Sequence, residues 1–346
     1  MTQFYETNIK DIVLHFVGNK NNDEPIKCSR FVLNFDETTK DILTNYFIPP
    51  FTKSQEYFNF HHDIELNMNE VFSCANNIFD NPETLLEQSQ NLAKHLYEQS
   101  THPKIKGGEF YVVYFKDCIL NGETVDAVGL FKSENKDTFL KVYPSGEGFE
   151  IESQQGVNIN KLDKGCLIFN TEKENGYVVS VIDNTNKGSE AQYWIDDFLH
   201  ICQRKDEYYN TQNVLSLCKN FIKDELPQQF EVSKADQVDL LNNSVKFFKK
   251  NDSFDIEEFA NEVMGQPEII ETFNQYKSVY QREYDTEIED NFIISEQAVK
   301  KQARISKSVI KLDKNFHIYV HGNRELIEQG EDDKGKFYKV YYREES

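Results

Sequence analysis

Between Gly107 and Asn184 the chain alternates short apolar runs with turn residues, and this alternation limits the fold more than any other part of the sequence. No run in this stretch has the pattern of a helical crossover. Parallel strands need a crossover of roughly a dozen residues or more, whereas antiparallel strands can be joined by short turns. The stretch therefore predicts one antiparallel sheet, with strands rich in β-branched and aromatic residues at Phe110–Phe115, Thr124–Lys132, Thr138–Tyr143, Gly165–Asn170 and Gly176–Ile182.

Helical patterns precede and follow this stretch. Asp36–Phe47 predicts a helix that ends before a Pro pair, and Asn81 followed by Pro82 is typical of a helix start. Residues 211–284 predict four helices with short loops. The chain closes on two alternating runs, Phe316–Val320 and Lys336–Tyr342, which predict strands.

These patterns predict an α+β fold: an antiparallel meander flanked by helices, then a helical segment and a small C-terminal β element. The chain has 346 residues, enough for two domains. We expect an N-terminal α+β domain at residues 1–205, which holds the sheet. We expect residues 206–346 to form a helical region that ends in a β-hairpin.

The formal net charge is −21, with 13% aromatic residues. The aromatic and aliphatic residues supply a core, which excludes a disordered chain. A strongly acidic surface repels polyanions at long range, which argues against a simple histone-like coat protein but leaves room for a local basic site.

The sequence has no sign of a zinc ribbon, a signal peptide or a membrane span. No two cysteines have the C-x-x-C spacing of a zinc or redox motif. The N-terminus is polar, and no apolar run approaches the ~20 residues of a spanning helix. We expect a cytoplasmic protein without membrane contact, whose scattered cysteines are buried free thiols: Cys28, Cys74, Cys118, Cys166, Cys202 and Cys218.

One basic segment, Ser295–Asn315, stands out from the acidic chain. At about 100° per residue, a helix over this segment would place four of its cations within roughly 60° of one another, opposite an apolar side that includes Ala298 and Leu312. Such a helix suits a phosphate backbone. The alternative is a strand at Arg304–Leu312 that pairs with Phe316–Val320, and a solvated charged face explains the same charges without a ligand. The candidate DNA contacts are Lys300, Lys301, Arg304, Lys307, Lys311 and Lys314.

No set of residues gives a strong signal of catalysis. His61, His62 and Asp63 lack the spacing of helical metal ligands. Asp196 and Asp197 form a carboxylate pair that suits a cap or solvent. Phosphate-binding glycine motifs and the nucleophile elbow are absent from the sequence. A faint likeness to a metal-dependent nuclease, with acids on neighbouring strands, involves Asp117, Asp126, Glu134 and Lys136. We therefore predict no catalytic residue, no metal and no cofactor.

Five whole segments resemble the bacterial nucleoid-associated protein family of the NdpA type, in the same order along the chain. The resemblance implies a cytoplasmic protein found with the nucleoid and presumed to bind DNA. It transfers no catalytic signature and no residue-level DNA-binding motif. The segments are GGEFYVVYF (Gly107–Phe115), VGLFKSENKDTF (Val128–Phe139), GCLIFNT (Gly165–Thr171), NTNKGSEAQYWIDDFL (Asn184–Leu199) and VKKQARISKSVIKLDKNFHIYVHG (Val299–Gly322).

Three functions are compatible with the sequence. The first is a non-enzymatic protein, expected to be a homodimer, that binds double-stranded DNA through phosphates with little sequence specificity. The second is an adaptor in the nucleoid that binds another DNA-acting protein, which the acidic charge favours. The third is the metal-dependent nuclease.

Overall fold

The computed structural model describes residues 7–53, 56–120, 122–185, 192–284, 286–305, 309–312, 316–320, 324–342 and 344. It divides into two compact units, residues 1–204 and 205–346. We call these the sheet unit and the helical unit and describe each by itself.

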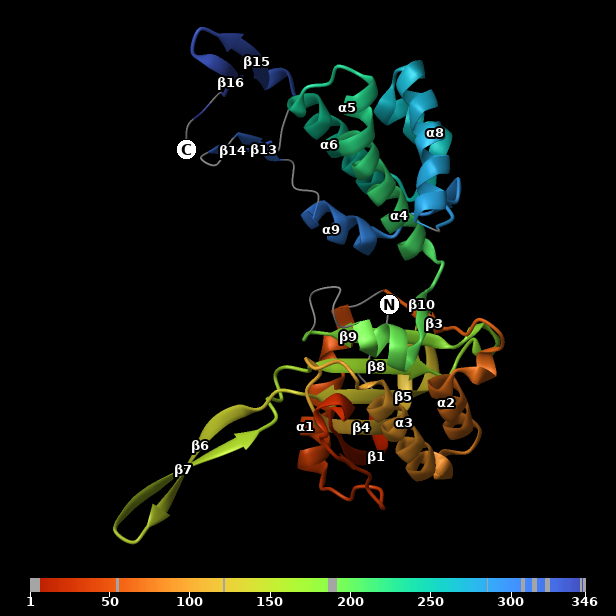
Figure 1. Cartoon of the computed structure of the whole chain (residues 1–346), viewed down its shortest axis with the longest axis vertical. Coiled ribbons are helices and arrows are strands. Elements are labelled where there is room, and N and C mark those ends of the chain that lie inside the picture. The colour runs from red at the N-terminus through yellow and green to blue at the C-terminus, as the bar shows by residue number, and fades with distance from the viewer. Residues whose placement is uncertain are drawn as a thin grey trace. The chain divides into compact units, whose positions relative to one another are not determined.

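The sheet unit is built on an eight-stranded sheet whose paired strands are all antiparallel. The predicted antiparallel sheet and the α+β class are confirmed. The strand order is β10-β3-β9-β8-β5-β4-β1-β2 (Figure 1). The strands are β1 Asn8–Val17, β2 Ile26–Lys27, β3 Phe58–Phe60, β4 Gly108–Leu120, β5 Glu123–Ser133, β8 Lys164–Phe169, β9 Val178–Asp183 and β10 Ile201–Gln203.

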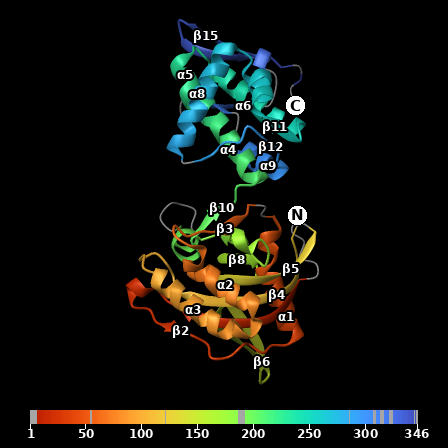
Figure 2. The same cartoon turned by 90° about the vertical axis from the view of Figure 1, so that its right-hand side faces the viewer.

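Alternate residues of β4 point to opposite faces of the sheet, as the period of a strand requires. Val112 packs in the cluster formed with α2 (Glu70–Asp80) and α3 (Leu85–Gln99). Its neighbour Val113 packs in the cluster formed with α1 (Glu37–Phe47). Figure 2 shows α2 and α3 on one face and α1 on the other. The sheet is buried on both sides, which explains its near-continuous apolar strands.

The helix starts could be predicted because the residue that caps each helix lies directly before its first turn in the sequence. Asp36 accepts a hydrogen bond from the Thr39 amide at 2.8 Å and begins α1. Asn81 accepts one from Glu83 at 3.2 Å, with Pro82 in the first turn of a short 3₁₀ helix that leads into α3. Both expected helix starts are confirmed.

One predicted strand of the meander lies outside the sheet. Thr138–Tyr143 falls within β6 (Asp137–Ser145), which pairs with β7 (Gly148–Gly156) in a separate two-stranded sheet, while β5 pairs directly with β8. The placement of this strand was wrong because its apolar residues are not core residues. Every residue from Asp137 to Tyr143 is exposed.

A buried polar network lies at one end of β5 and β8. Lys132 and Lys164 are directly opposite each other on these strands, and both side chains are fully buried. Lys132 lies 3.2 Å from the Glu134 carboxylate and Lys164 lies 2.7 Å from that of Asp183. The Tyr193 ring lies 5.4 and 5.2 Å from the two ammonium groups, and its hydroxyl donates to Glu134 at 2.7 Å. Each buried charge thus has a counter-ion, as burial requires.

The helical unit packs its helices around a cluster of aromatic side chains that includes Phe221, Phe247, Phe259 and Phe273. The predicted capping box is present at the start of α6, where Ser233 and Asp236 exchange hydrogen bonds. The helices are α4 Glu207–Asn220, α5 Leu226–Gln229, α6 Lys234–Lys250, α7 Ile256–Phe259, α8 Pro267–Glu283 and α9 Glu296–Ile305.

Three small antiparallel pairs complete the helical unit. The predicted strands Phe316–Val320 and Lys336–Tyr342 correspond to β14 and β16, and each belongs to its own hairpin. The pairs are β11 Ser253–Asp255 with β12 Asn291–Ile293, β13 Val309–Leu312 with β14 Phe316–Tyr319, and β15 Ile327–Asp332 with β16 Gly335–Val340.

All six cysteines are free, as expected. Four of them are buried, but Cys28 is half-buried and Cys202 is exposed, so burial was predicted too broadly. None of the helices in the described ranges combines the length and apolar character that would let it cross a membrane.

Candidate nucleic-acid interface

The basic segment is a helix followed by a strand. Residues 296–305 form α9, and residues 309–312 form β13, which pairs with β14 in the register Val309↔Tyr319. Of the two alternatives, the helix is right for residues 296–305 and the strand paired with residues 316–319 is right for residues 309–312. Lys307 and Lys314 lie outside the described residues, as does the side chain of Arg304.

Helix α9 is amphipathic in the way that the sequence predicted. Ala298 and Val299 are buried where α9 packs against α4 and α6. Lys300 is exposed and forms an ion pair with Glu296 at 2.8 Å. Lys301 is exposed and lies over the Tyr208 ring of α4, 5.5 Å from its centre. The apolar side holds the helix on the unit and the lysines face solvent.

Lys311 lies at a second basic site, on β13. Its neighbour Ile310 is buried against Ala235 and Val238 of α6, and Lys311 is exposed, as alternation along a strand requires. Partial burial lowers the pKa of Lys223, and the positive charges of Lys219, Lys234 and Lys311 lower it further. Each of these three lysines thus lies near enough to Lys223 for its charge to act on it, and we call the four side chains the lysine cluster.

Few nearby acidic groups neutralise the positive charge of the lysine cluster. Lys234 donates to the Gln237 side chain at 2.9 Å, and Asp224 favours the charged form of Lys223. Lys219, Lys223 and Lys311 form no ion pair with any residue that the structure describes. The four cations come from α4, the turn after it, α6 and β13. Charge counting along the sequence missed three of them because Lys223 and Lys234 have acids close by in the sequence and Lys219 is not part of a run of cations. The spacing of Lys219 and Lys223, one helical turn, was a signal.

The two basic sites lie toward opposite ends of α4. Tyr208, which Lys301 covers, and Lys219 are eleven residues apart, so they project from the same side of the helix to within about 20° and are separated by about 17 Å along its axis. The structure thus divides the predicted contacts, with Lys300 and Lys301 near the start of α4 and Lys311 near its end.

Two of the acids considered for nuclease chemistry, Asp126 and Glu134, are engaged with other partners, whereas Asp117 is exposed. Asp126 accepts hydrogen bonds from Tyr114 at 2.7 Å and Lys116 at 2.6 Å. Glu134 belongs to the buried network, and Lys136 pairs with Glu109. Across the described ranges, no three His, Cys, Asp or Glu side chains form a group that could hold a metal ion.

The other residues considered for metal binding or catalysis interact mainly with their own neighbours in the sequence. His61 lies 3.3 Å from Asp63, and the His62 ring accepts from the Ile64 amide at 3.3 Å. Burial and the neighbouring Asp197 raise the pKa of Asp196, although both carboxylates are exposed.

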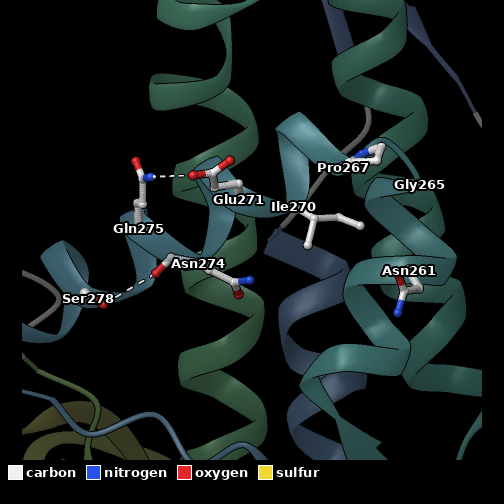
Figure 3. Close-up of a pocket in the computed structure, with 8 residues that line it drawn as sticks. All are labelled: Asn261, Gly265, Pro267, Ile270, Glu271, Asn274, Gln275 and Ser278. Carbon is white, nitrogen blue, oxygen red and sulfur yellow. Dashed lines mark hydrogen bonds between the residues drawn. The ribbon is translucent and has the colours of Figure 1, made fainter.

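A groove on α8 has the wrong chemistry for phosphates. It is lined by side chains of α8 and of the π-helical turn before it, together with Gly265 (Figure 3). Its polar groups are amides, a hydroxyl and the Glu271 carboxylate, which accepts from Gln275 at 3.4 Å. No lysine or arginine is among the residues that line it.

A model of the family described as nucleoid-associated protein YejK matches residues 13–336, nearly the whole chain. No curated protein matches the chain.

Proposed function

The chain belongs to the nucleoid-associated protein family that it matches over residues 13–336, and from this we propose that it is a non-enzymatic, nucleoid-bound cytoplasmic protein that contacts the phosphates of double-stranded DNA. Binding has little sequence specificity, because lysines on phosphates read no base edges. The protein acts as a homodimer, which doubles the number of basic sites on an otherwise acidic molecule.

The observation that carries this proposal is the lysine cluster. The neighbouring cations lower the pKa of Lys223, so its charged form is in an unfavourable state, and a phosphate placed among the lysines relieves it while condensed counterions are released from the DNA. Lys311, predicted from the sequence, belongs to this cluster, and the family is named for its association with the nucleoid. Because the chain has a net charge of −21, the rest of its surface repels DNA, and DNA binds only at this local basic site.

The spacing along α4 suits a duplex that touches both basic sites. Tyr208, which Lys301 covers, and Lys219 mark two points about 17 Å apart on one side of the helix. The phosphates of a duplex supply one negative charge per ~1.7 Å of axis, so a duplex lying along α4 presents phosphates to both ends. Lys300, Lys301, Arg304, Lys307 and Lys314 then extend the contact made by the lysine cluster.

The test is fluorescence anisotropy of a labelled duplex across a salt series. The first variant carries Lys219→Ala, Lys223→Ala and Lys311→Ala, and the second carries Lys300→Ala and Lys301→Ala. Each phosphate contact contributes about 0.9 to the slope of log K against log salt, so the slope should fall by up to about 3 in the first variant and about 2 in the second.

The matched control is Lys246→Ala with Lys249→Ala, near the other end of α6, about 20 Å along its axis from Lys234. It removes charge from the same unit and should leave the slope unchanged. Equal losses in all three variants would mean that only net charge matters and would overturn the assignment of the site. No binding even at low salt would overturn direct DNA contact and favour the adaptor.

A further inference from the structure

The hairpin of β6 and β7 is an arm that extends from the sheet unit. Its strands pair with each other from Asp137↔Gly156 to Ser145↔Gly148 and with no other strand in the described part of the chain. Figure 1 and Figure 2 both show it extending away from the main sheet. At about 3.3 Å per residue, nine-residue strands make the arm about 30 Å long.

The base of the arm is fixed by a buried carboxylate. Asp163 is only 2% exposed and accepts hydrogen bonds at 2.8 Å from the backbone amides of Glu134 and Asn135, directly before β6. It also accepts from the Asn135 side chain at 2.9 Å. The arm is thus held at its origin.

The two faces of the arm differ in chemistry. Residues directly opposite each other share a face. One face carries Leu140, Val142 and Pro144 opposite Ser153, Ile151 and Phe149. The other face carries Lys141 opposite Glu152 and Tyr143 opposite Glu150. We call the first the apolar face; it has no charged residue, although 28% of the chain is charged.

The apolar face is exposed. Leu140 is 67% exposed, Phe149 76% and Ile151 66%. An isolated two-stranded hairpin is at best marginally stable in water, and contiguous exposed apolar side chains mark an interaction surface. The main sheet protects its edges with the two-residue β2 and the three-residue β10, whereas both long edges of the arm are open.

We propose that the apolar face of the arm is a dimer contact and that its occupant is a second copy of this chain. The inference deepens the proposed homodimer and does not depend on DNA binding. Two copies with net charge −21 repel each other, so a self-contact needs a surface without charge, and this face is one.

The available area also favours a second copy. A face about 30 Å long and roughly 10 Å wide has a flat footprint of roughly 300 Å². A stable interface buries about 800 Å² on each partner, so one arm laid on an unrelated protein falls short. In a twofold dimer that exchanges arms, each copy contributes its own arm and binds the arm of the other copy. The area that each copy buries is then twice the footprint of one arm, and the uneven surface of the side chains adds to this area.

The test measures the molecular mass of the protein in solution by light scattering, across a concentration series. The first variant is Leu140→Asn with Phe149→Asn, on the apolar face. The control is Phe139→Asn with Tyr143→Asn, which removes two large side chains from the opposite face. A second variant replaces residues 138–155 by an Asn-Gly turn, because Asp137 and Gly156 are already paired.

We expect the wild type and the control at twice the chain mass of 40.6 kDa, and both arm variants at 40.6 kDa. The Kd of the dimer should rise at least about 100-fold, as for the loss of central interface side chains. A wild-type protein that stays at 40.6 kDa, or arm variants that stay dimeric, would overturn the proposal. The salt slope of DNA binding is a separate measurement, so failure of the DNA proposal leaves this result unaffected.

Discussion

His15 makes the sheet unit sensitive to mild acid. It lies on β1, is 2% exposed, and its Nδ1 accepts a hydrogen bond from the Ser29 amide at 3.0 Å. Its Nε2 is buried without a hydrogen-bond partner among the described residues. Burial lowers its pKa from 6.5 to about 4. A protonated ring would lose the hydrogen bond from Ser29 and leave a positive charge in the core.

The sign of the pH effect follows from where protons bind. Between pH 6.5 and about 4, the unfolded His15 takes up a proton and the folded one does not. The free energy of unfolding therefore falls as the pH drops through this window and is unaffected by His15 above it. A shift of this size corresponds to roughly 3 kcal/mol, fully lost below about pH 4.

The assay is urea unfolding of wild type and His15→Asn, followed by Trp194 fluorescence. Trp194 is the only tryptophan of the chain and is fully buried in the sheet unit, so its signal reports on that unit. Asn keeps an acceptor near the position of Nδ1 and does not titrate. Between about pH 7 and about pH 4.5, the wild type should lose roughly 2–3 kcal/mol more than the variant. An equal loss in both proteins would refute the reasoning.

Three further predictions concern the two units. Glu134→Gln leaves the fully buried Lys132 ammonium without its counter-ion and should cost about 3–5 kcal/mol by the same fluorescence assay, whereas Glu134→Gln combined with Lys132→Met should recover part of the loss; no recovery would contradict a charge effect. Ser233→Ala removes the capping box of α6 and should cost about 1 kcal/mol by circular dichroism melting of the helical unit, and an unchanged midpoint would contradict it. Fragments 1–205 and 206–346, expressed separately, should each unfold cooperatively in calorimetry, and an unfolded fragment would contradict two independent domains.

The parts of the fold that follow from local chemistry could be predicted. Short loops between apolar runs predicted the antiparallel sheet, and side chains that cap the next turn predicted where α1 and α6 begin. The pairing of β3 with β10 could not be predicted, because three residues carry too little pattern to identify a partner so far along the chain. The arm was missed because β6 has the composition of a core strand without its burial, whereas β7 is too polar to be identified as a strand.

The candidate site was predictable only in part. The run of cations in residues 295–315 can be seen in the sequence alone, and it identified Lys300, Lys301 and Lys311 as candidate contacts. The lysine cluster is a product of tertiary structure, since Lys219, Lys223 and Lys234 come to Lys311 from separate elements. The break between α9 and β13 was unpredictable from periodicity because the residues fit both periods.

The position of β3 in the sheet also sets an order of events during synthesis. Phe58–Phe60 pairs with β9 at Val179 and with β10 at Ile201, so about 140 residues separate Phe60 from its last partner. Ribosomes add about 5–20 residues per second, so this segment waits roughly 7–28 s for its neighbours. Until β9 has been made, Phe58 and Phe60 have no partner strand, and until β10 has been made the β3 edge of the nascent sheet is open. A nascent chain that stops before residue 201 thus leaves β3 as an open edge strand, the kind of surface that chaperones bind.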